Sequence, residues 1–261
     1  MGNLKGDILR TGFLVILVIA VFAPILLVNA QDYTVGVKAG DWIKYGQITV
    51  TWTGNGTVPS IVTDEKKVDW VRIDVLNVTG TTASLNYTVH FNNGTQTFLN
   101  LDVDVPSGYQ FGYIFLIASN LTSGDQVVPQ TPGFIINQTV TRFYAGANRN
   151  VNIIDAKSSI EGYLIEEKIC WDQKTGIMVE EYTNITYTTN PSGYVAESMK
   201  ATETNMWSAN ALDLIQNNLI YIIAGIAIII VIVAATIVLR RRKTQSPQQP
   251  PPPSAPAPPQ S

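Results

Sequence analysis

The stretch GYLIEEKICWDQKTGIMVEEYTNITY, residues 162–187, has the pattern of a β-hairpin. Apolar side chains recur at most odd-numbered positions along both arms. Such alternation is typical of a strand that buries one face. A short loop that ends in Gly176 separates the two arms, and glycine at this place is typical of a tight hairpin turn. The stretch therefore predicts two paired antiparallel strands.

The same alternation runs through the rest of the middle of the chain. It is found at 47–54, 71–75, 83–91 and 99–105, where the odd-numbered or the even-numbered residues are expected to be buried together. The sequence NNGT at 92–95 predicts a tight turn between two of these strands. We expect roughly nine or ten strands and therefore a mainly β fold. It would be an antiparallel β-sandwich or an open, strongly curved sheet of half-barrel form.

Residues 109–121, YQFGYIFLIASNL, are apolar in both parities, so periodicity alone does not decide their structure. They predict either a fully covered strand or a short helix that caps an open sheet. The aromatic residues of this stretch are expected to belong to the core, or else to form an aromatic face for a ligand. They are Tyr109, Phe111, Tyr113 and Phe115.

The run LIYIIAGIAIIIVIVAATIVL, residues 219–239, contains no charged residue. A helix of this length spans about 30 Å, the thickness of the hydrocarbon core of a bilayer, so we predict one transmembrane helix. The juxtamembrane segment 208–218 leads into it, and the helix could begin as early as Ser208. Basic residues next to a span stay in the cytoplasm and stop its transfer. Here they are Arg240, Arg241, Arg242 and Lys243, and the proline-rich tail within 240–261 is expected in the cytoplasm with them.

Residues 1–30 have the features of a signal peptide: a basic start, an apolar stretch, and small residues before the expected cleavage after Ala30. An uncleaved anchor, which would give two spans, is the alternative. In both cases residues 31–207 are predicted to form a β-rich extracellular domain. With a cleaved signal peptide the protein would have a type I orientation in the cell membrane.

Composition excludes several kinds of partner and site. Between residues 31 and 214 there are 11 Lys and Arg against 19 Asp and Glu, a formal charge of −8. This acidic balance argues against nucleic acid as a partner. The single cysteine, Cys170, is expected to be buried in a strand, and the single histidine, His90, on a polar face. One residue of each kind is too few for a zinc site, so we expect no metal and no cofactor.

Seven Asn-x-Thr sequons lie in the middle of the chain. Each is an acceptor site for N-glycosylation if this part of the chain is exported. The parity of residues 83–91 places one of them, Asn86, on the polar face of its strand, where a glycan has room. The sequons predict a glycoprotein modified at Asn55, Asn77, Asn86, Asn93, Asn120, Asn137 and Asn184.

Glu167 and Glu181 interrupt the apolar parity of the 162–187 hairpin. A five-residue loop would place them directly opposite each other, and a three-residue loop with a glycine bulge would make them diagonal neighbours. Carboxylates on an apolar face repel each other unless they bind a cation, share a proton or reach solvent. They are therefore the candidate site for a ligand or cation, or an acid/base pair as in glycoside hydrolysis. A bulge that turns one of them outward is the structural alternative.

Two segments resemble known proteins. AGDWIKYG, residues 39–46, and CWDQKTGIMVEEY, residues 170–182, look like elements of archaeal single-pass cell-surface proteins of unassigned function. The second segment also resembles a hairpin of the LolA/LolB-like lipoprotein carriers, whose half-barrel strands turn through an Asp-x-Lys-Thr-Gly sequence. That resemblance implies a concave face for a lipid or another apolar ligand. The predicted span departs from those carriers, so shuttling is not expected.

No nucleophile elbow, phosphate-binding glycine loop or calcium loop occurs in the sequence, so we assign no catalytic residue. The expected protein is a single-pass cell-surface glycoprotein whose β domain has a binding or envelope role and is not an enzyme. Its expected partners are the lipid bilayer and, outside the cell, a glycan, a protein or a small apolar molecule. The alternatives are a membrane-tethered hydrolase that uses Glu167 and Glu181, and a LolA-like protein that binds an apolar ligand.

Overall fold

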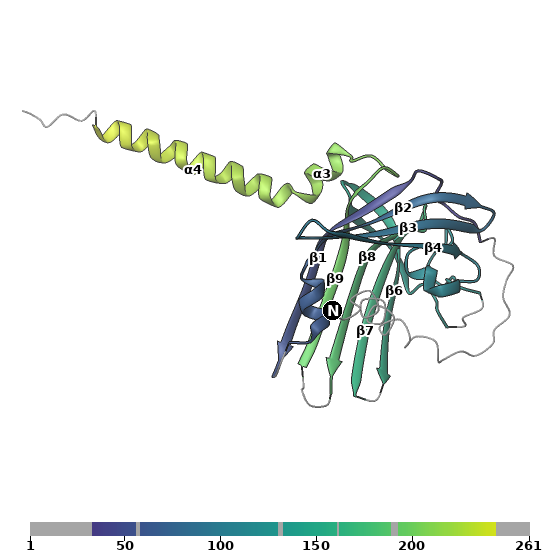
Figure 1. The fold of residues 1–261 in the computed structure, drawn as a ribbon. Helices are drawn as coiled ribbons and strands as arrows, with labels where there is room; N and C mark the ends of the chain where they lie inside the picture. Colours follow the sequence, from purple (N-terminus) through teal and green to yellow (C-terminus); the bar gives the residue numbers. More distant parts are fainter. Residues whose placement is uncertain (1–32, 56–57, 130–132, 161, 189–192, 244–261) are drawn as a thin grey trace, which may run out of the picture. The chain divides into compact units, whose positions relative to one another are not determined.

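The computed structural model describes residues 33–55, 58–129, 133–160, 162–188 and 193–243. The β domain has one open antiparallel sheet of nine strands, in the order β4-β3-β2-β1-β9-β8-β7-β6-β5 (Figure 1). Of the two expected architectures, the open sheet is the one that forms. The strands are β1 (Trp42–Gly54), β2 (Val68–Thr79), β3 (Thr82–Phe91), β4 (Gln96–Asp104), β5 (Gln138–Tyr144), β6 (Ala147–Ile160), β7 (Tyr163–Asp172), β8 (Met178–Tyr187) and β9 (Gly193–Thr204).

The sheet consists of two meanders, β1–β4 and β5–β9, which meet where the first strand pairs with the last. β1 pairs with β9 from Ile43↔Thr204 to Gly54↔Gly193, with register shifts on both sides of Tyr45. β2, β3 and β4 run across the direction of β6 to β9 in Figure 1, so the sheet is strongly curved. The pairing of β1 with β9 brings the beginning and the end of the domain side by side.

The connection between β4 and β5, residues 105–137, covers part of one face of the sheet. We call this face inner; it is the face that carries the odd-numbered residues of β7. The connection contains the 3-10 helix η2 (Tyr109–Ile114), and beyond it Leu116 forms an isolated bridge with Ile177. Of the two structures expected for 109–121, the short helix on an open sheet is therefore the one observed, followed by an extended segment.

The six-residue helix α2 (Ser60–Glu65) lies between β1 and β2 and is a second cover of the inner face. Its Val62 is fully buried. Its last residue, Glu65, shares a hydrogen bond with Glu197 of β9. Because Glu197 pairs with Val50 and Thr183 on the inner face, α2 lies on that face.

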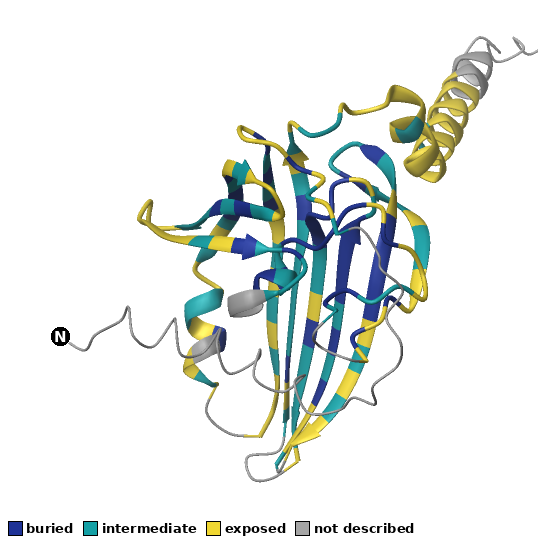
Figure 2. Ribbon diagram, turned by 90° about the vertical axis from the view of Figure 1, so that its right-hand side faces the viewer, coloured by how far each residue is buried: buried dark blue, intermediate teal, exposed yellow. Residues whose placement is uncertain are grey.

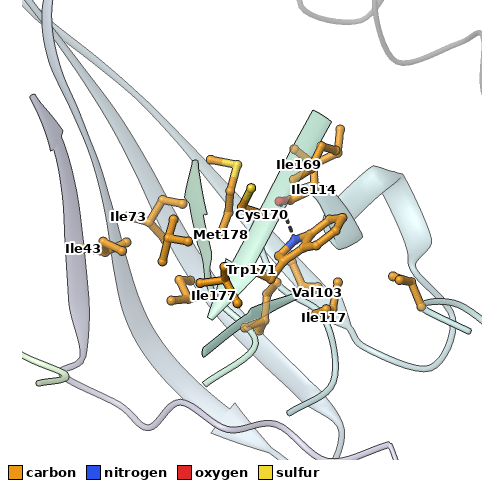
Figure 3. Packing of buried hydrophobic residues seen from close by; sticks show 14 of the residues in the cluster. Ile43, Ile73, Val103, Ile114, Ile117, Ile169, Cys170, Trp171, Ile177 and Met178 are labelled. Carbon is orange, nitrogen blue, oxygen red and sulfur yellow. Dashed lines mark hydrogen bonds between the residues drawn. The ribbon is translucent and has the colours of Figure 1, made fainter. Parts of the chain in front are cut away.

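Much of the hydrophobic core lies between the sheet and the β4–β5 connection (Figure 3). Trp171 of β7 is fully buried, and its Nε1 donates hydrogen bonds to the carbonyl oxygens of Tyr113 and Ile114 at 2.9 and 3.0 Å. Ile43 and Ile73 approach from β1 and β2. Each such apolar side chain stabilises the fold by about 1.5–3 kcal/mol. In Figure 2 the buried residues gather mainly in the upper part of the long strands.

The predicted hairpin at 162–187 is confirmed as β7 and β8, and its turn is held by hydrogen bonds. Gly176 has φ +74° and donates from its backbone to the Asp172 carbonyl oxygen at 2.7 Å. The Asp172 carboxylate accepts from the Thr175 backbone and hydroxyl, both at 2.8 Å, and pairs with Arg149 at 2.8 Å. The predicted turn at 92–95 is confirmed as well, with Gly94 at φ +82°.

One detail of the expected alternation is wrong. Val103 and Val105 are buried as expected, but Leu99 of the same stretch is 46% exposed. β4 is the edge strand of the sheet, and the β4–β5 connection packs near its carboxyl end, so its first residues remain exposed. Cys170 is fully buried, as expected.

Residues from Ile215 onward belong to a unit separate from the β domain. Helix α4 (Leu219–Lys243) contains one stretch, Leu219–Thr236, that is long and apolar enough to cross a membrane. A separate helix, α3 (Ala211–Asn217), precedes it, with a turn at Asn218 between the two. The expected start at Ser208 is therefore too early, because Asn210 Oδ1 accepts from the Leu212 backbone at 3.0 Å and caps α3 there. The expected signal peptide, residues 1–30, lies outside the described residues, as does the end of the tail from 244.

Candidate functional site

Three polar side chains from neighbouring strands form a row on the inner face. Glu167 of β7 is opposite Thr183 of β8, and Thr183 is opposite Glu197 of β9. Neighbouring strands lie about 4.8 Å apart, so the Cα atoms of the two glutamates are about 10 Å apart with the threonine between them. We call Glu167, Thr183 and Glu197 the acidic row.

Each member of the acidic row has a buried oxygen atom without a hydrogen-bond partner among the described residues. These atoms are Glu167 Oε2, Thr183 Oγ1 and Glu197 Oε1. Glu167 is 4% exposed and Thr183 is 3% exposed. An unpaired buried polar group costs about 1–3 kcal/mol of stability. Packing of the sheet alone does not account for three such atoms side by side.

Glu181 lies next to the acidic row, two residues from Thr183 along β8. It is opposite Ile169, which makes it a diagonal neighbour of Glu167, and both glutamates face inward. The diagonal placement is one of the two arrangements expected, and it accompanies a register shift between Cys170 and Trp171 rather than a three-residue loop. Neither glutamate is turned outward. Burial, and then the charge of Glu197, raise the pKa of Glu181 to about 7.

The other carboxyl groups of the site also hold protons more tightly than free glutamate does. Burial, with a further contribution from the charge of Glu181, raises the pKa of Glu167 to about 8. Burial raises the pKa of Glu65 and of Glu197, and the hydrogen bond between them raises the first further and lowers the second. Glu65 is therefore the protonated donor of this pair, and Glu197 is the acceptor.

Three tyrosines adjoin these carboxyl groups from the side of the core. Burial is the main reason why the pKa values of Tyr45 and Tyr87 are raised, and the charge of Glu181 adds to both. The pKa of Tyr113 is raised to about 12, by burial and then by the charge of Glu167. The Tyr45 hydroxyl donates to the Met178 carbonyl oxygen at 2.7 Å. The carboxyl groups thus lie at the border between the closed core and the rest of the inner face.

Acidic residues on the outer face of the same strands have cationic partners. Glu166, beside Glu167 in sequence, pairs with Lys157, and Glu180 pairs with Arg142 at 3.2 Å. By contrast, none of the ion pairs between described residues involves the inner glutamates. Within the described residues, no cation pairs with the acidic groups of the inner face.

Aromatic side chains lie beyond the acidic row, toward the loops that join β6 to β7 and β8 to β9. The ring of Trp52 meets that of Tyr187 edge-on, with centroids 5.6 Å apart, and Tyr187 meets Tyr163 at 5.3 Å. Gly193 leaves room for the indole, because a Cβ there would lie 2.6 Å from it. Tyr163 is 43% exposed. We call Trp52, Tyr163 and Tyr187 the aromatic rim.

The inner face thus offers hydrogen-bond acceptors and uncompensated acidic groups next to aromatic surface. Such surroundings favour a ligand that carries a donor or a positive charge at one end and an apolar body at the other. Within the described residues, no group of three or more His, Cys, Asp and Glu is placed to hold a metal ion. Neighbouring carboxyl groups with separated pKa values also occur in general acid–base catalysis.

Of the four residues of the predicted aromatic ligand face, the structure describes the side chains of two, Tyr113 and Phe115. Tyr113 packs against Phe134, with centroids 4.9 Å apart, and Phe115 packs against Tyr87 at 5.2 Å. Both therefore contribute to the core, which was the first of the two expectations for this stretch. The side chains of Tyr109 and Phe111 lie outside the described part of the chain. The side chains of the stop-transfer residues Arg240, Arg241, Arg242 and Lys243 also lie outside it, and their backbone forms the end of α4.

The sequon asparagines differ in exposure. Asn86 and Asn184 lie in strands, on the outer face, and both are half-buried. The Oδ1 atom of Asn184 is buried without a hydrogen-bond partner among the described residues. Asn137 is exposed, and its Oδ1 accepts from the Asp155 backbone at 2.6 Å. The sequon residues that are fully exposed are Asn55, Asn77, Asn93, Asn120 and Asn137.

Glu65, Glu197 and the aromatic rim were not singled out from the sequence. Glu197 could have been found, because it interrupts the apolar parity of Val195 and Met199 in the same way that Glu181 interrupts that of its strand. Glu65 gives no such signal, since its place depends on how α2 packs.

Comparison with protein-family models, with curated proteins and with solved structures finds no match to this chain. A function has to be argued from the chain's own residues.

Proposed function

We propose that the protein is a single-pass membrane protein whose β domain faces the outside of the cell and binds a small molecule with an apolar body, without converting it. The observation that carries the proposal is the inner face, where the aromatic rim adjoins an acidic row whose buried oxygens have no partners among the described residues. A purely structural domain gains nothing from unpaired buried polar atoms, because each of them lowers its stability.

The proposed membrane topology is supported by the apolar stretch of α4 and by the positive charge at the end of the same helix. The apolar stretch Leu219–Thr236 ends a few residues before four consecutive basic residues, at 240–243. Clusters of this kind remain in the cytoplasm, which supports the proposal that the acidic β domain lies on the opposite side of the cell membrane. The exposed sequon asparagines are then available for glycans.

Protease treatment of intact cells tests this topology. The proposal expects digestion of the β domain and protection of the carboxyl-terminal tail. Digestion of the tail alone, with the β domain left intact, would show that the orientation is the opposite of the one proposed. Mass spectrometry of the mature protein reports both the first residue and the occupied sequons. We expect it to begin at Gln31 and to carry glycans first at the five fully exposed sites.

Ligand binding can be tested with N-phenylnaphthylamine, an uncharged apolar fluorophore, and the full chain in lipid nanodiscs. Fluorescence above that of empty nanodiscs is expected, and Trp52→Ala should weaken the binding at least about fivefold because it removes the largest surface of the aromatic rim. Trp70→Ala is the matched control, since Trp70 stacks on His90 at 4.7 Å on the outer face. Equal signals from both variants would reject binding at the inner face and favour an envelope role.

A membrane-tethered hydrolase is the second candidate, and it is supported by the diagonal placement of Glu167 and Glu181 on the inner face, with pKa values raised mainly by burial to about 8 and about 7. A carboxyl group that is protonated at neutral pH can act as a general acid. Glu181→Gln distinguishes the two functions. It should leave the binding of N-phenylnaphthylamine intact if the domain only binds, and it should abolish turnover of chromogenic glycosides if the domain is a hydrolase.

A further inference from the structure

We propose that the acidic row recognises a primary ammonium group, so that the ligand of the inner face is an amphiphilic amine. This inference rests on the proposed function, because it names the polar end of the molecule whose apolar body the aromatic rim would hold. It is carried by the unpaired atoms of the acidic row, by the charge around them, and by the distance from the row to the rim.

The number and type of the free acceptors match an ammonium group. Glu167 Oε2, Thr183 Oγ1 and Glu197 Oε1 come from three adjacent strands and are all buried without partners among the described residues. An alkylammonium group has three N–H donors and no acceptor. Two glutamate side chains that flank a threonine can converge on one donor group above it, since each reaches several ångströms from its strand. A hydroxyl group has one donor and would leave two of the acceptors unpaired.

The charge around the row favours a cation over a neutral donor. Glu181 stands beside the row, and no ion pair among the described residues supplies it or the two glutamates of the row with a positive partner. Hydrogen bonds from an ammonium group to carboxylates are shorter and about twice as strong as neutral ones. The metal alternative is weaker, because the described residues provide no set of ligands for one.

The register of the sheet sets the size of the ligand. Val195 is the next residue of β9 after Glu197 on the inner face, and it pairs with Trp52 of β1. Two residues further along the strands, Tyr187 pairs with Tyr163. With a rise of about 3.3 Å per residue, the aromatic side chains begin about 7 Å from the row and extend to about 13 Å. An amine whose apolar body covers this distance, such as an arylalkyl amine, fits both parts of the face.

Binding of an ammonium group would release a proton. Glu167 holds its proton at neutral pH, and when R–NH₃⁺ binds, the Glu167 O–H proton passes to solvent while the ammonium keeps its three hydrogens. The titratable groups that face Glu167 are acidic or phenolic: Glu181 of β8, Glu197 of β9, Glu65 of α2 and Tyr113 of η2. The inner residues of β6 that neighbour it, such as Ala156, do not titrate. Affinity should therefore increase as the pH rises from about 6 to about 9.

The test uses phenylethylamine and isothermal titration calorimetry of the full chain in lipid nanodiscs, at pH 7, in two buffers that differ in ionisation enthalpy. If one proton is released, the buffer takes it up, so the observed binding heats should differ by the difference between the ionisation enthalpies of the two buffers. Phenylethanol and trimethyl(phenylethyl)ammonium have the same aromatic body without three N–H donors, and both should bind at least about tenfold more weakly.

Two neighbouring variants complete the test. Glu167→Gln keeps the size of the side chain and should weaken the binding of phenylethylamine at least tenfold and remove the buffer dependence. Glu166→Gln, which changes the outer-face neighbour that pairs with Lys157, should change neither. Circular dichroism shows whether each variant is folded, and the trimethyl analogue tests the proposal on the unaltered chain.

The outcomes separate this inference from the proposed function. Equal binding of the amine and the trimethyl analogue, or unchanged amine binding by Glu167→Gln, would overturn the ammonium site, even where Trp52→Ala still weakens N-phenylnaphthylamine binding. Loss of N-phenylnaphthylamine binding in Trp70→Ala as well as Trp52→Ala would overturn the proposed function itself, and the ammonium site with it.

Discussion

Glu167 and Thr183 face each other across β7 and β8, and both leave an oxygen atom buried without a hydrogen-bond partner among the described residues. Their neighbours on one side are Ile165 and Ile185, a pair typical of an apolar sheet face. A valine and an isoleucine at 167 and 183 would pack without any polar cost. Glu167 is protonated at neutral pH, so without a ligand it is uncharged. The free-energy cost of burying its side chain is therefore smaller than that of burying a carboxylate.

The stability of the domain should fall with rising pH because of Glu167. Its pKa is 4.5 when unfolded and about 8 when folded, so the folded chain binds the proton more tightly. The stabilisation that comes from protonated Glu167 is fully present below the pKa of this group in the unfolded chain. It is lost as the pH rises through its pKa in the folded chain, at up to about 1.4 kcal/mol per pH unit. In urea titrations followed by tryptophan fluorescence, Glu167→Gln should flatten this fall. Glu166→Gln should retain it, and a wild-type profile in Glu167→Gln would contradict the assignment.

Trp171 should be the most sensitive aromatic residue of the core. Trp171→Phe removes the Nε1 donor from two carbonyl oxygens, those of Tyr113 and Ile114, and leaves space where the larger ring was. We expect the free energy of unfolding to fall by about 2–4 kcal/mol. Trp207→Phe is the control: Trp207 is half-buried and donates one longer hydrogen bond, at 3.2 Å, to Tyr144. It should lose less than about 1.5 kcal/mol in the same urea titration.

The two hairpin glycines should respond differently to alanine. Both have positive φ, +74° at Gly176 and +82° at Gly94. A Cβ at Gly176 would lie 2.0 Å from the Ile117 carbonyl oxygen, whereas at Gly94 it meets nothing within 4 Å. Gly94→Ala should therefore cost about 1 kcal/mol, and Gly176→Ala more than about 3 kcal/mol, in thermal or urea unfolding. Equal losses would mean that the β4–β5 connection does not press on the turn.

Cys170 should report the unfolding of the whole domain. The thiol is fully buried, and burial, with the charge of Glu180 next in weight, raises its pKa to about 11. A thiolate is the reactive form, so a disulfide reagent at pH 8 should modify Cys170 only when the domain opens. The modification rate should be negligible in the native protein and rise along the urea unfolding curve. Rapid modification without denaturant would contradict a closed core at this strand.

Much of the fold could be predicted because alternation is a local property. The 162–187 hairpin, the NNGT turn and the buried face of 71–75 each follow from residues adjacent in sequence. The exposure of Leu99 could not be predicted, because it depends on β4 being the edge of the sheet. The strand order could not be predicted either, since no local signal in 47–54 indicates that its partner lies at 193–204.

In the candidate site, too, the residues marked by a local sequence pattern could be predicted, and those placed by packing between distant segments could not. Glu167 and Glu181 stand out because they break an apolar parity, and the structure places both on the inner face. Glu65 joins them only through the packing of a six-residue helix that has no periodicity to read. The aromatic rim combines residues of β1, β7 and β8, and Trp52 reaches Tyr187 because β9, with its glycine at 193, lies between them.

The pairing of β1 with β9 also affects how the domain is made. During synthesis the amino-terminal strand emerges first, and one of its two edges stays bare until the ninth strand has been translated. Bare edges invite association with other chains, and contacts between distant segments form slowly. The ninth strand ends shortly before α4 in sequence. A nascent chain truncated before β9 leaves this edge of β1 bare and should therefore be the form most prone to aggregate.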